Sequence, residues 1–393
     1  MYRGKLVFAQ LMDQLPLHVF RRCVARYAGR YPPLSFSHLD QFLCMAFAQL
    51  TYRESLRDIE TCLRAQGNKL YHLGIRGRVA RSTLADANER RDFRIYRDFA
   101  MALIHTAREL YAGERFAVEL ANSAYALDTT TIELSLALFP WAHYQAAKAA
   151  LRLHTQLDLR GNIPSFVHIS DGKMGDVALL DLIAFEPGSF YIMDRGFIDF
   201  ARLHAIDQAS AFFVIRSRSN FQYQRVQSQR IDRTTGLRCD QRVLLSGLRA
   251  AAGYPQPIRR IKFYDAQHNT LLVLLTNHPK LPALTITQLY RCRWQIELFF
   301  KWLKQHLRIK AFFGTSENAV KTQIWIAISV YVLVAIVKKR FGCSASLYTT
   351  LQILSLTLFE KTPLHELLAS IDHKEHPMDS TTQLNLFEEI SGQ

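Results

Sequence analysis

The sequence predicts an α/β protein with an all-α N-terminal region, a mixed core of strands and helices, and a β-rich insertion in that core. Three observations support this. Apolar residues recur at helical spacing over the first hundred or so residues, period-two alternation begins at Ala124, and strand-like runs lie between Asp194 and Tyr290. At 393 residues and 49% hydrophobic composition, the chain can bury one large core plus satellite units.

The N-terminal region is expected to be helical because apolar side chains recur every three or four residues. A helix at 56–65, a glycine-containing turn and a second helix at 82–91 would suit a helix-turn-helix that enters the major groove of DNA. Arginines cluster between Gly74 and Arg97, and the alternative for them is a solvated basic helix face. The expected helices span 15–27, 39–50, 55–65, 82–88 and 93–111.

The charge of the chain favours a polyanionic partner. Lys and Arg outnumber Asp and Glu by 49 to 34, which gives a formal net charge of +15. An anionic membrane is the weaker candidate, because the apolar run 324–337 is shorter than the ~20 residues of a membrane-spanning helix. This run predicts a buried core helix, and the polar start of the chain predicts a cytoplasmic protein without a secretory signal.

Strands are predicted from Ala124 onward. Residues 124–134 form one candidate, and the runs 151–159 and 163–169 form a hairpin around a turn at Arg160 to Asn162. Asp176 is expected to cap a helix over 177–185, and the apolar run 190–193 ends at Asp194. This βββαβ order is the one that opens a ribonuclease H-like fold.

The predicted insertion, about 197–288, contains strand-like runs at 212–216, 238–245, 258–264 and 270–276. Residues 216–260 hold ten Arg and two Asp, with aromatic residues between them. Such a surface suits a sugar-phosphate backbone. The alternative is a solvated basic sheet.

The sequence near the end of this insertion contains the strongest catalytic signal. Tyr290, Arg293, Glu297 and Lys304 lie at offsets that place them within an arc of roughly 60° on an α-helix. A salt-bridge stripe is the alternative. Together with Asp128 in a strand and Asp194 at a strand end, Glu297 would complete three carboxylates from separate elements. Three carboxylates can hold two Mg²⁺ or Mn²⁺ ions for phosphodiester chemistry.

These residues resemble the DDE transposases of bacterial insertion sequences, specifically the insertion-sequence-four family. Its Y-x2-R-x3-E-x6-K signature is matched by the four residues from Tyr290 to Lys304, and Asp194-Arg195-Gly196-Phe197 matches its second-aspartate motif. N-terminal runs such as 55–58 and 82–88 are similar to the helical domain that precedes this catalytic domain. The resemblance implies metal-dependent excision and integration, with Asp128, Asp194 and Glu297 as both catalytic residues and metal ligands.

The resemblance also implies DNA contacts and partners. Tyr290, Arg293, Lys304 and Arg195 would hold phosphates, and the partners would be terminal inverted repeats and target DNA, bound by a homodimer in the synaptic complex. Relatives form a DNA hairpin using a tryptophan in the insertion. The segment 195–289 has no Trp, so Trp294 is the candidate base contact and a hairpin route is in doubt. The expected location is the bacterial cytoplasm, at the nucleoid.

Two alternative functions remain open from sequence: a ribonuclease H-like nuclease or resolvase without strand transfer, and a non-catalytic DNA-binding protein derived from a transposase. The second predicts a lost carboxylate, and none is lost. The proposed division is a DNA-binding helical domain at 1–115, a catalytic domain at 116–369 and a flexible tail at 370–393. The six cysteines are scattered, which predicts reduced thiols rather than disulfides or a zinc site.

The tail contains an apolar motif in a polar segment. Gln383, Leu384, Leu386 and Phe387 belong to the string Gln-Leu-Asn-Leu-Phe. Apolar anchors in a flexible tail predict a docking peptide, and the string resembles the one by which bacterial proteins bind the replication sliding clamp. The alternative is that the tail folds back and buries these side chains on its own domain.

Overall fold

The computed structural model describes residues 4–27, 29, 33, 35–114, 118, 120, 122–145, 148–219, 221–307 and 312–372. The peptide that contains Gln383, Leu384, Leu386 and Phe387 lies outside these residues, so its docking role stays a prediction. All six cysteines are free thiols, as their scattered positions predict.

Helices build the N-terminal region, as the sequence periodicity predicts. Ser37 starts α3 with a reciprocal capping box, because its hydroxyl accepts from the Asp40 N–H and the Asp40 carboxylate accepts from the Ser37 N–H. The predicted pair α4 and α5 pack against each other, with two 3₁₀ turns in the connection. The helices are α1 (Val7–Met12), α2 (Leu17–Tyr27), α3 (His38–Leu50), α4 (Leu56–Ala65), α5 (Arg81–Arg90) and α6 (Arg94–Tyr111).

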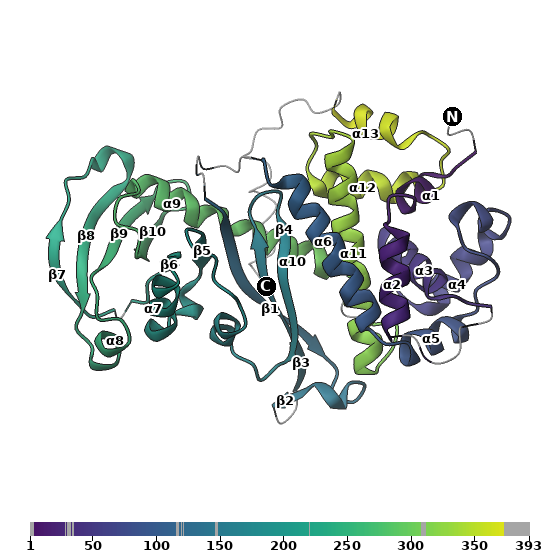
Figure 1. Cartoon of the computed structure of the whole chain (residues 1–393), viewed down its shortest axis with the longest axis horizontal. Helices are drawn as coiled ribbons and strands as arrows, with labels where there is room; N and C mark the ends of the chain where they lie inside the picture. The colour runs from purple at the N-terminus through teal and green to yellow at the C-terminus, as the bar shows by residue number, and fades with distance from the viewer. Residues whose placement is uncertain are drawn as a thin grey trace.

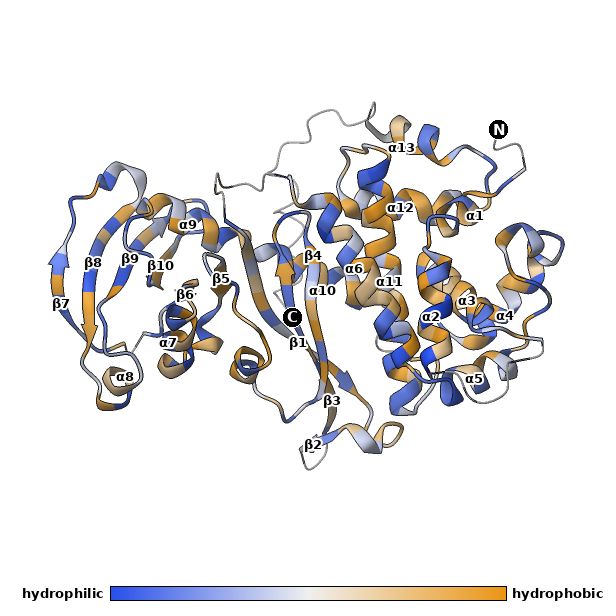
Figure 2. Cartoon of the chain, in the orientation of Figure 1, coloured by the Kyte–Doolittle hydropathy of each residue, from blue (hydrophilic) through white to orange (hydrophobic). Residues whose placement is uncertain are grey.

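Helix α11 (Glu317–Arg340) lies at the centre of the helical half of the molecule (Figure 1). It is long and apolar enough to cross a membrane, but 94% of its most apolar window is buried inside the protein. Figure 2 shows the apolar composition of α11 and of α12 (Leu347–Thr357) beside it. The predicted core helix is therefore confirmed, and it extends beyond the apolar run into charged residues at both ends.

The N-terminal helices share one core with the last helices of the chain. Helix α11 packs against both α6 and α3, and the Tyr111 hydroxyl donates to the Ala335 carbonyl at 2.9 Å. The Val7 N–H donates to the Glu360 carbonyl at 2.9 Å, between α12 and α13 (Leu364–Asp372). The boundary proposed near residue 115 stays a prediction, and the helices on its two sides pack together.

A mixed sheet forms the catalytic half, with β1 at its centre. Strand β1 pairs antiparallel with β3, and β3 pairs antiparallel with β4 and β2. On the other side, β1 pairs parallel with β5 and β5 pairs parallel with β6. This order is that of a ribonuclease H-like core. The strands are β1 (Ala124–Leu134), β2 (His143–Gln145), β3 (Lys148–Asp158), β4 (Ile163–Asp171), β5 (Phe190–Met193) and β6 (Phe212–Arg216).

The predicted β-rich segment continues this sheet outward instead of forming a separate one. Strand β10 pairs antiparallel with β6, and β9, β8 and β7 follow in order. Strand β6 pairs in parallel with β5 and thus belongs to the core, and we assign the strands after it to the insertion. These are β7 (Tyr223–Ser228), β8 (Leu237–Leu245), β9 (Ile258–Asp265) and β10 (Thr270–Thr276), with α7 (Phe200–Gln208) and α8 (Leu248–Gly253).

Two local expectations are wrong. The segment expected to be an α-helix over 177–185 is a 3₁₀ helix, Asp176–Asp181, and the Asp176 carboxylate binds Arg152 at 2.9 Å instead of capping a helix. The single helix expected over Tyr290 to Lys304 is two helices, α9 (Ala283–Cys292) and α10 (Trp294–Leu307). Arg293 lies at the junction, where backbone hydrogen bonds tighten to three-residue spacing.

Candidate active site

Asp128, inside β1, and Asp194, directly after β5, lie at the same level of two adjacent strands. Strand β1 pairs in parallel register with β5, with Ala126 opposite Ile192. Asp128 lies two residues beyond Ala126, and Asp194 lies two residues beyond Ile192. Because neighbouring strands are about 4.8 Å apart, this register brings the two carboxyl groups to the same edge of the core.

Glu297 is joined to Asp128 by a shared cation. One guanidinium nitrogen of Arg293, Nη1, lies 3.3 Å from Asp128 Oδ2, and the other, Nη2, forms an ion pair with Glu297 Oε1. Arg293, at the junction of α9 and α10, thus contacts both carboxylates. The first and third carboxylates of the predicted trio therefore belong to one site.

The charges of the three carboxylates interact. Burial, together with the negative charges of Asp194 and Glu297, raises the pKa of Asp128 to about 6, although the positive charge of Arg293 lowers it. A buried carboxylate beside like charges is costly to ionise, and a nearby cation lowers that cost. The site is therefore built to stabilise positive charge, and in this structure Arg293 supplies it.

Asp194 is oriented by its own backbone turn. Its Oδ1 accepts from the Gly196 N–H at 2.8 Å. A Cβ at residue 196 would lie 2.9 Å from Asp194 Oδ1, so glycine leaves room for that carboxylate, and 3.6 Å from Asp176 Oδ2, which is an ordinary contact distance. Asp176 is thus a fourth acid beside the site, and Arg152 neutralises it.

The other residues predicted to contact DNA differ in how close they lie to the carboxylates. Tyr290 is buried under Arg293, whose guanidinium lies 5.9 Å from the ring centroid, so both belong to the site. Trp294 is 49% exposed at the start of α10. Lys304 is exposed about two turns after Glu297, and no described contact joins it to the carboxylates.

Sequence reasoning did not single out two arginines near the site. Arg216 ends β6 and acts electrostatically on Tyr290. Arg218 follows it and donates to the Arg195 carbonyl at 3.4 Å. A cavity of about 520 Å³ lies beside Asp194 and is lined by Arg195, Gly196, Arg218 and Ser219. A pattern in the sequence could have indicated these two arginines. The apolar run of β6 ends in arginines, just as the apolar run of β5 is followed by Asp194 and Arg195.

The donor set suits hard divalent ions, because Mg²⁺ and Mn²⁺ prefer carboxylate oxygens. Within the stretches that the structure describes, however, no three His, Cys, Asp or Glu side chains are placed to hold one ion together. The Arg293 guanidinium lies between two of the carboxylates instead. The carboxylates are therefore suitable ligands for these ions. In this structure the Arg293 guanidinium lies between Asp128 and Glu297, where an ion would bind.

Comparison with known proteins identifies the family of the chain. A family model described as a transposase DDE domain matches residues 120–333, and a model described as a domain of unknown function matches residues 3–76. Transposase y4zB of Sinorhizobium fredii is 32% identical over 71% of this chain and 77% of its own length. A transposase of insertion sequence element IS4SA from Synechocystis is 22% identical over 87% of this chain and 95% of its own length.

Two further proteins are similar over a shorter part of the chain or at lower sequence identity. A transposase of insertion sequence element IS5377 from Geobacillus stearothermophilus is 28% identical over 53% of this chain and 54% of its own length. The piggyBac transposase, in a cryo-electron-microscopy synaptic complex with hairpin DNA, has a TM-score of 0.46 at 9% identity, covering 97% of this chain and 82% of that one. With more than half of the chain matched by the family model, the protein belongs to the DDE transposases of bacterial insertion sequences, enzymes that cleave and join DNA.

Proposed function

We propose that this transposase excises and integrates its insertion sequence at a site formed by Asp128, Asp194 and Glu297, which hold two Mg²⁺ or Mn²⁺ ions. One observation carries the proposal: Arg293 contacts Asp128 and Glu297 together, although Arg293 and Asp128 are 165 residues apart in sequence. Two bound ions would activate the attacking oxygen and stabilise the leaving oxygen of a phosphodiester.

The protein groups around the carboxylates would bind and orient DNA. Arg293 offers a planar fork of donors that suits a phosphate, and Tyr290 lies beneath it. Arg195 lines the neighbouring cavity. We assign Lys304, about two turns after Glu297 on α10, to a DNA phosphate, as the insertion-sequence-four signature implies. The exposed Trp294, next to Arg293 at the start of α10, is assigned to a DNA base. A hydrolytic nuclease and a non-catalytic derivative are not favoured by the family assignment.

Arg293 and the metal ions compete for the same carboxylates. Replacing Arg293 by Gln is expected to strengthen Mn²⁺ binding in the absence of DNA by about tenfold, because removing one cation a few ångströms away is worth at least ~1 kcal/mol. Calorimetric titration with Mn²⁺ measures this affinity without relying on activity.

Arg291→Gln is the matched control for that titration, since Arg291 pairs with Asp265 and not with the carboxylate trio. Its Mn²⁺ affinity should equal that of the unmodified protein. Weaker Mn²⁺ binding in the Arg293→Gln protein would contradict competition and would show that the guanidinium holds the carboxylates in place for the ions.

Recognition of the terminal repeats is assigned to the N-terminal helices and the basic insertion. Arg76, Arg78, Arg81 and Arg90 are exposed around α5. Other arginines of this cluster are engaged in the protein, including Arg91, which donates to the Ser37 carbonyl at 2.8 Å. We propose that a homodimer pairs two ends at the bacterial nucleoid in the cytoplasm. The mass of the protein–DNA complex tests the dimer, and band shifts with Ala at the four exposed arginines test recognition.

The C-terminal peptide is proposed to bind the replication sliding clamp, with Gln383 as polar anchor and Leu384, Leu386 and Phe387 as apolar contacts. A labelled peptide of residues 370–393 is expected to retain purified clamp in a pull-down. The Leu386→Ala/Phe387→Ala peptide should lose that binding, because the apolar anchors supply most of the buried area. Equal retention by both peptides, or none by either, would refute the proposal.

A further inference from the structure

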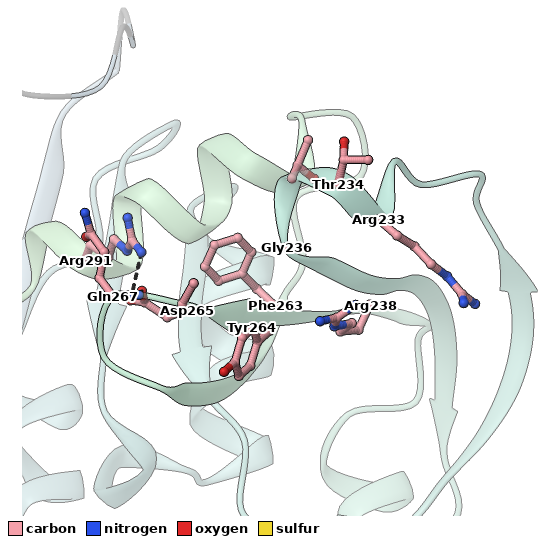
Figure 3. Close-up of a pocket in the computed structure, with 11 residues that line it drawn as sticks. Arg233, Thr234, Gly236, Arg238, Phe263, Tyr264, Asp265, Gln267 and Arg291 are labelled. Atoms are coloured by element: carbon pink, nitrogen blue, oxygen red, sulfur yellow. Dashed lines mark hydrogen bonds and ion pairs between the residues drawn. The ribbon is translucent and has the colours of Figure 1, made fainter.

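A second basic pocket lies away from the carboxylates, between the insertion and the end of α9. Its volume is about 310 Å³. Figure 3 shows Arg291 at one end and Arg238 and Arg233 at the other, with the rings of Phe263 and Tyr264 between them. The remaining lining residues are Thr234, Thr235, Gly236, Asp265, Ala266 and Gln267.

The arginines stand over aromatic rings. The Arg238 guanidinium lies 5.4 Å from the centre of the Tyr264 ring, and the Arg291 guanidinium lies 5.5 Å from that of Phe263. Arg233 is exposed and has no partner in the described part of the chain. Stacked guanidinium groups keep their N–H edges free to bind an anion while their faces rest on the rings.

The acid in the pocket is already neutralised. Asp265 is buried, and its carboxylate lies 2.7 Å from Arg291 Nη2 and 3.0 Å from His268 Nδ1. It also accepts a hydrogen bond from the Gln267 N–H at 3.1 Å. It cannot repel an approaching anion as a free surface carboxylate would. Among the residues that line the pocket, Asp265 is the only carboxylate, so none of them offsets the positive charges of Arg233 and Arg238 at the other end.

The wall of the pocket is held by backbone contacts. Gly236 has a φ of +92°, and a Cβ there would lie 2.7 Å from the Tyr264 carbonyl oxygen. The Gly236 carbonyl accepts from the Tyr264 N–H at 2.8 Å. Asp232 accepts from both the N–H and the hydroxyl of Thr234, which fixes the turn that carries Arg233. A site fixed before binding loses less entropy when a ligand arrives.

We propose that this pocket binds the sugar-phosphate backbone of DNA, with phosphates at Arg233 and Arg238 and a sugar against the Tyr264 ring. The proposal rests on the assigned DNA-joining function and adds a defined contact site outside the catalytic centre. Arg291 lies two residues before Arg293 in sequence, so the pocket adjoins the helix that leads into the active site. DNA held here is positioned to extend toward the carboxylates.

The test is the salt dependence of binding to a labelled duplex of random sequence, because phosphate contacts do not depend on sequence. Fluorescence anisotropy in EDTA keeps the measurement independent of catalysis. The Arg233→Ala/Arg238→Ala protein is expected to show a log Kd against log salt slope that is smaller by about 2, since each neutralised phosphate contributes about 0.9.

Arg340→Ala/Lys361→Ala is the matched control, because it removes the same charge from exposed positions at the end of α11 and between α12 and α13, outside both the pocket and the regions assigned to DNA. Its slope should change by less than half as much. Equal changes in the two double variants, or no change in the pocket variant, overturn the proposal. Failure of this proposal would leave the proposed catalytic function untouched, because the carboxylates are tested separately by the rate of DNA cleavage.

Discussion

Replacing Asp128 by Asn is expected to lower DNA cleavage by about a thousandfold or more while the protein still folds and binds DNA. Asn has the same shape but cannot supply a negative charge to a metal ion. Metal ions stabilise the transition state by several kcal/mol, and each ~1.4 kcal/mol is a tenfold change in rate. The same loss is expected for Asp194→Asn and Glu297→Gln. Nicking of an end-containing duplex with Mg²⁺ or Mn²⁺ measures it.

The matched control for these variants is Asp171→Asn. Asp171 is an exposed carboxylate at the end of β4, and its side chain accepts from the Lys173 N–H rather than facing the site. Its cleavage rate should stay within a few-fold of the unmodified protein. Near-normal cleavage by Asp128→Asn would remove Asp128 from the catalytic assignment.

A strand-transfer assay with the same proteins distinguishes DNA joining from hydrolysis. The unmodified transposase should transfer a precleaved end with a free 3′-hydroxyl into plasmid DNA, and the Asp128→Asn protein should not. Cleavage without transfer by the unmodified protein would instead support a hydrolytic nuclease. EDTA should stop both reactions by removing divalent ions.

Replacing Arg259 by Ala is expected to destabilise the protein by about 3–5 kcal/mol, because it leaves a buried charge without its partner. Arg259 and Asp240 are both about 95% buried, and Arg259 Nη2 lies 2.6 Å from Asp240 Oδ2. Arg259 also donates to the Leu281 carbonyl, just before α9. Loss of this residue therefore loosens the connection between the insertion and the helix that leads to Glu297.

Urea unfolding followed by circular dichroism measures the effect. Arg242→Ala removes an exposed arginine from neighbouring β8 and should change the free energy of unfolding by less than about 0.5 kcal/mol. The Asp240→Leu/Arg259→Met protein should recover part of the loss, because neither charge is then left buried alone. Equal stability of the Arg259→Ala and Arg242→Ala proteins would show that the buried pair contributes little.

The sequence by itself determined the elements whose signals are local. Alternating apolar residues predicted β1, β3 and β4, helical periodicity predicted α2 to α6, and the apolar run predicted α11 as a core helix. In the candidate trio, Glu297 came from a four-residue signature, Asp194 from an aspartate motif and Asp128 from its position in a strand, and the role of the trio stays a prediction. These predictions rest on spacing along the chain, which backbone geometry converts directly into a face of a helix or a strand.

Only the tertiary structure decided what depends on distant partners. The helix expected through Tyr290 divides at Arg293, whose guanidinium contacts Asp128 on β1. Asp176 pairs with Arg152 instead of capping a helix, and β6 joins the core through β5. Each outcome depends on burial and charge from segments far away in sequence. Ion pairs and strand pairing of this kind have no period in the chain, so local patterns cannot reveal them.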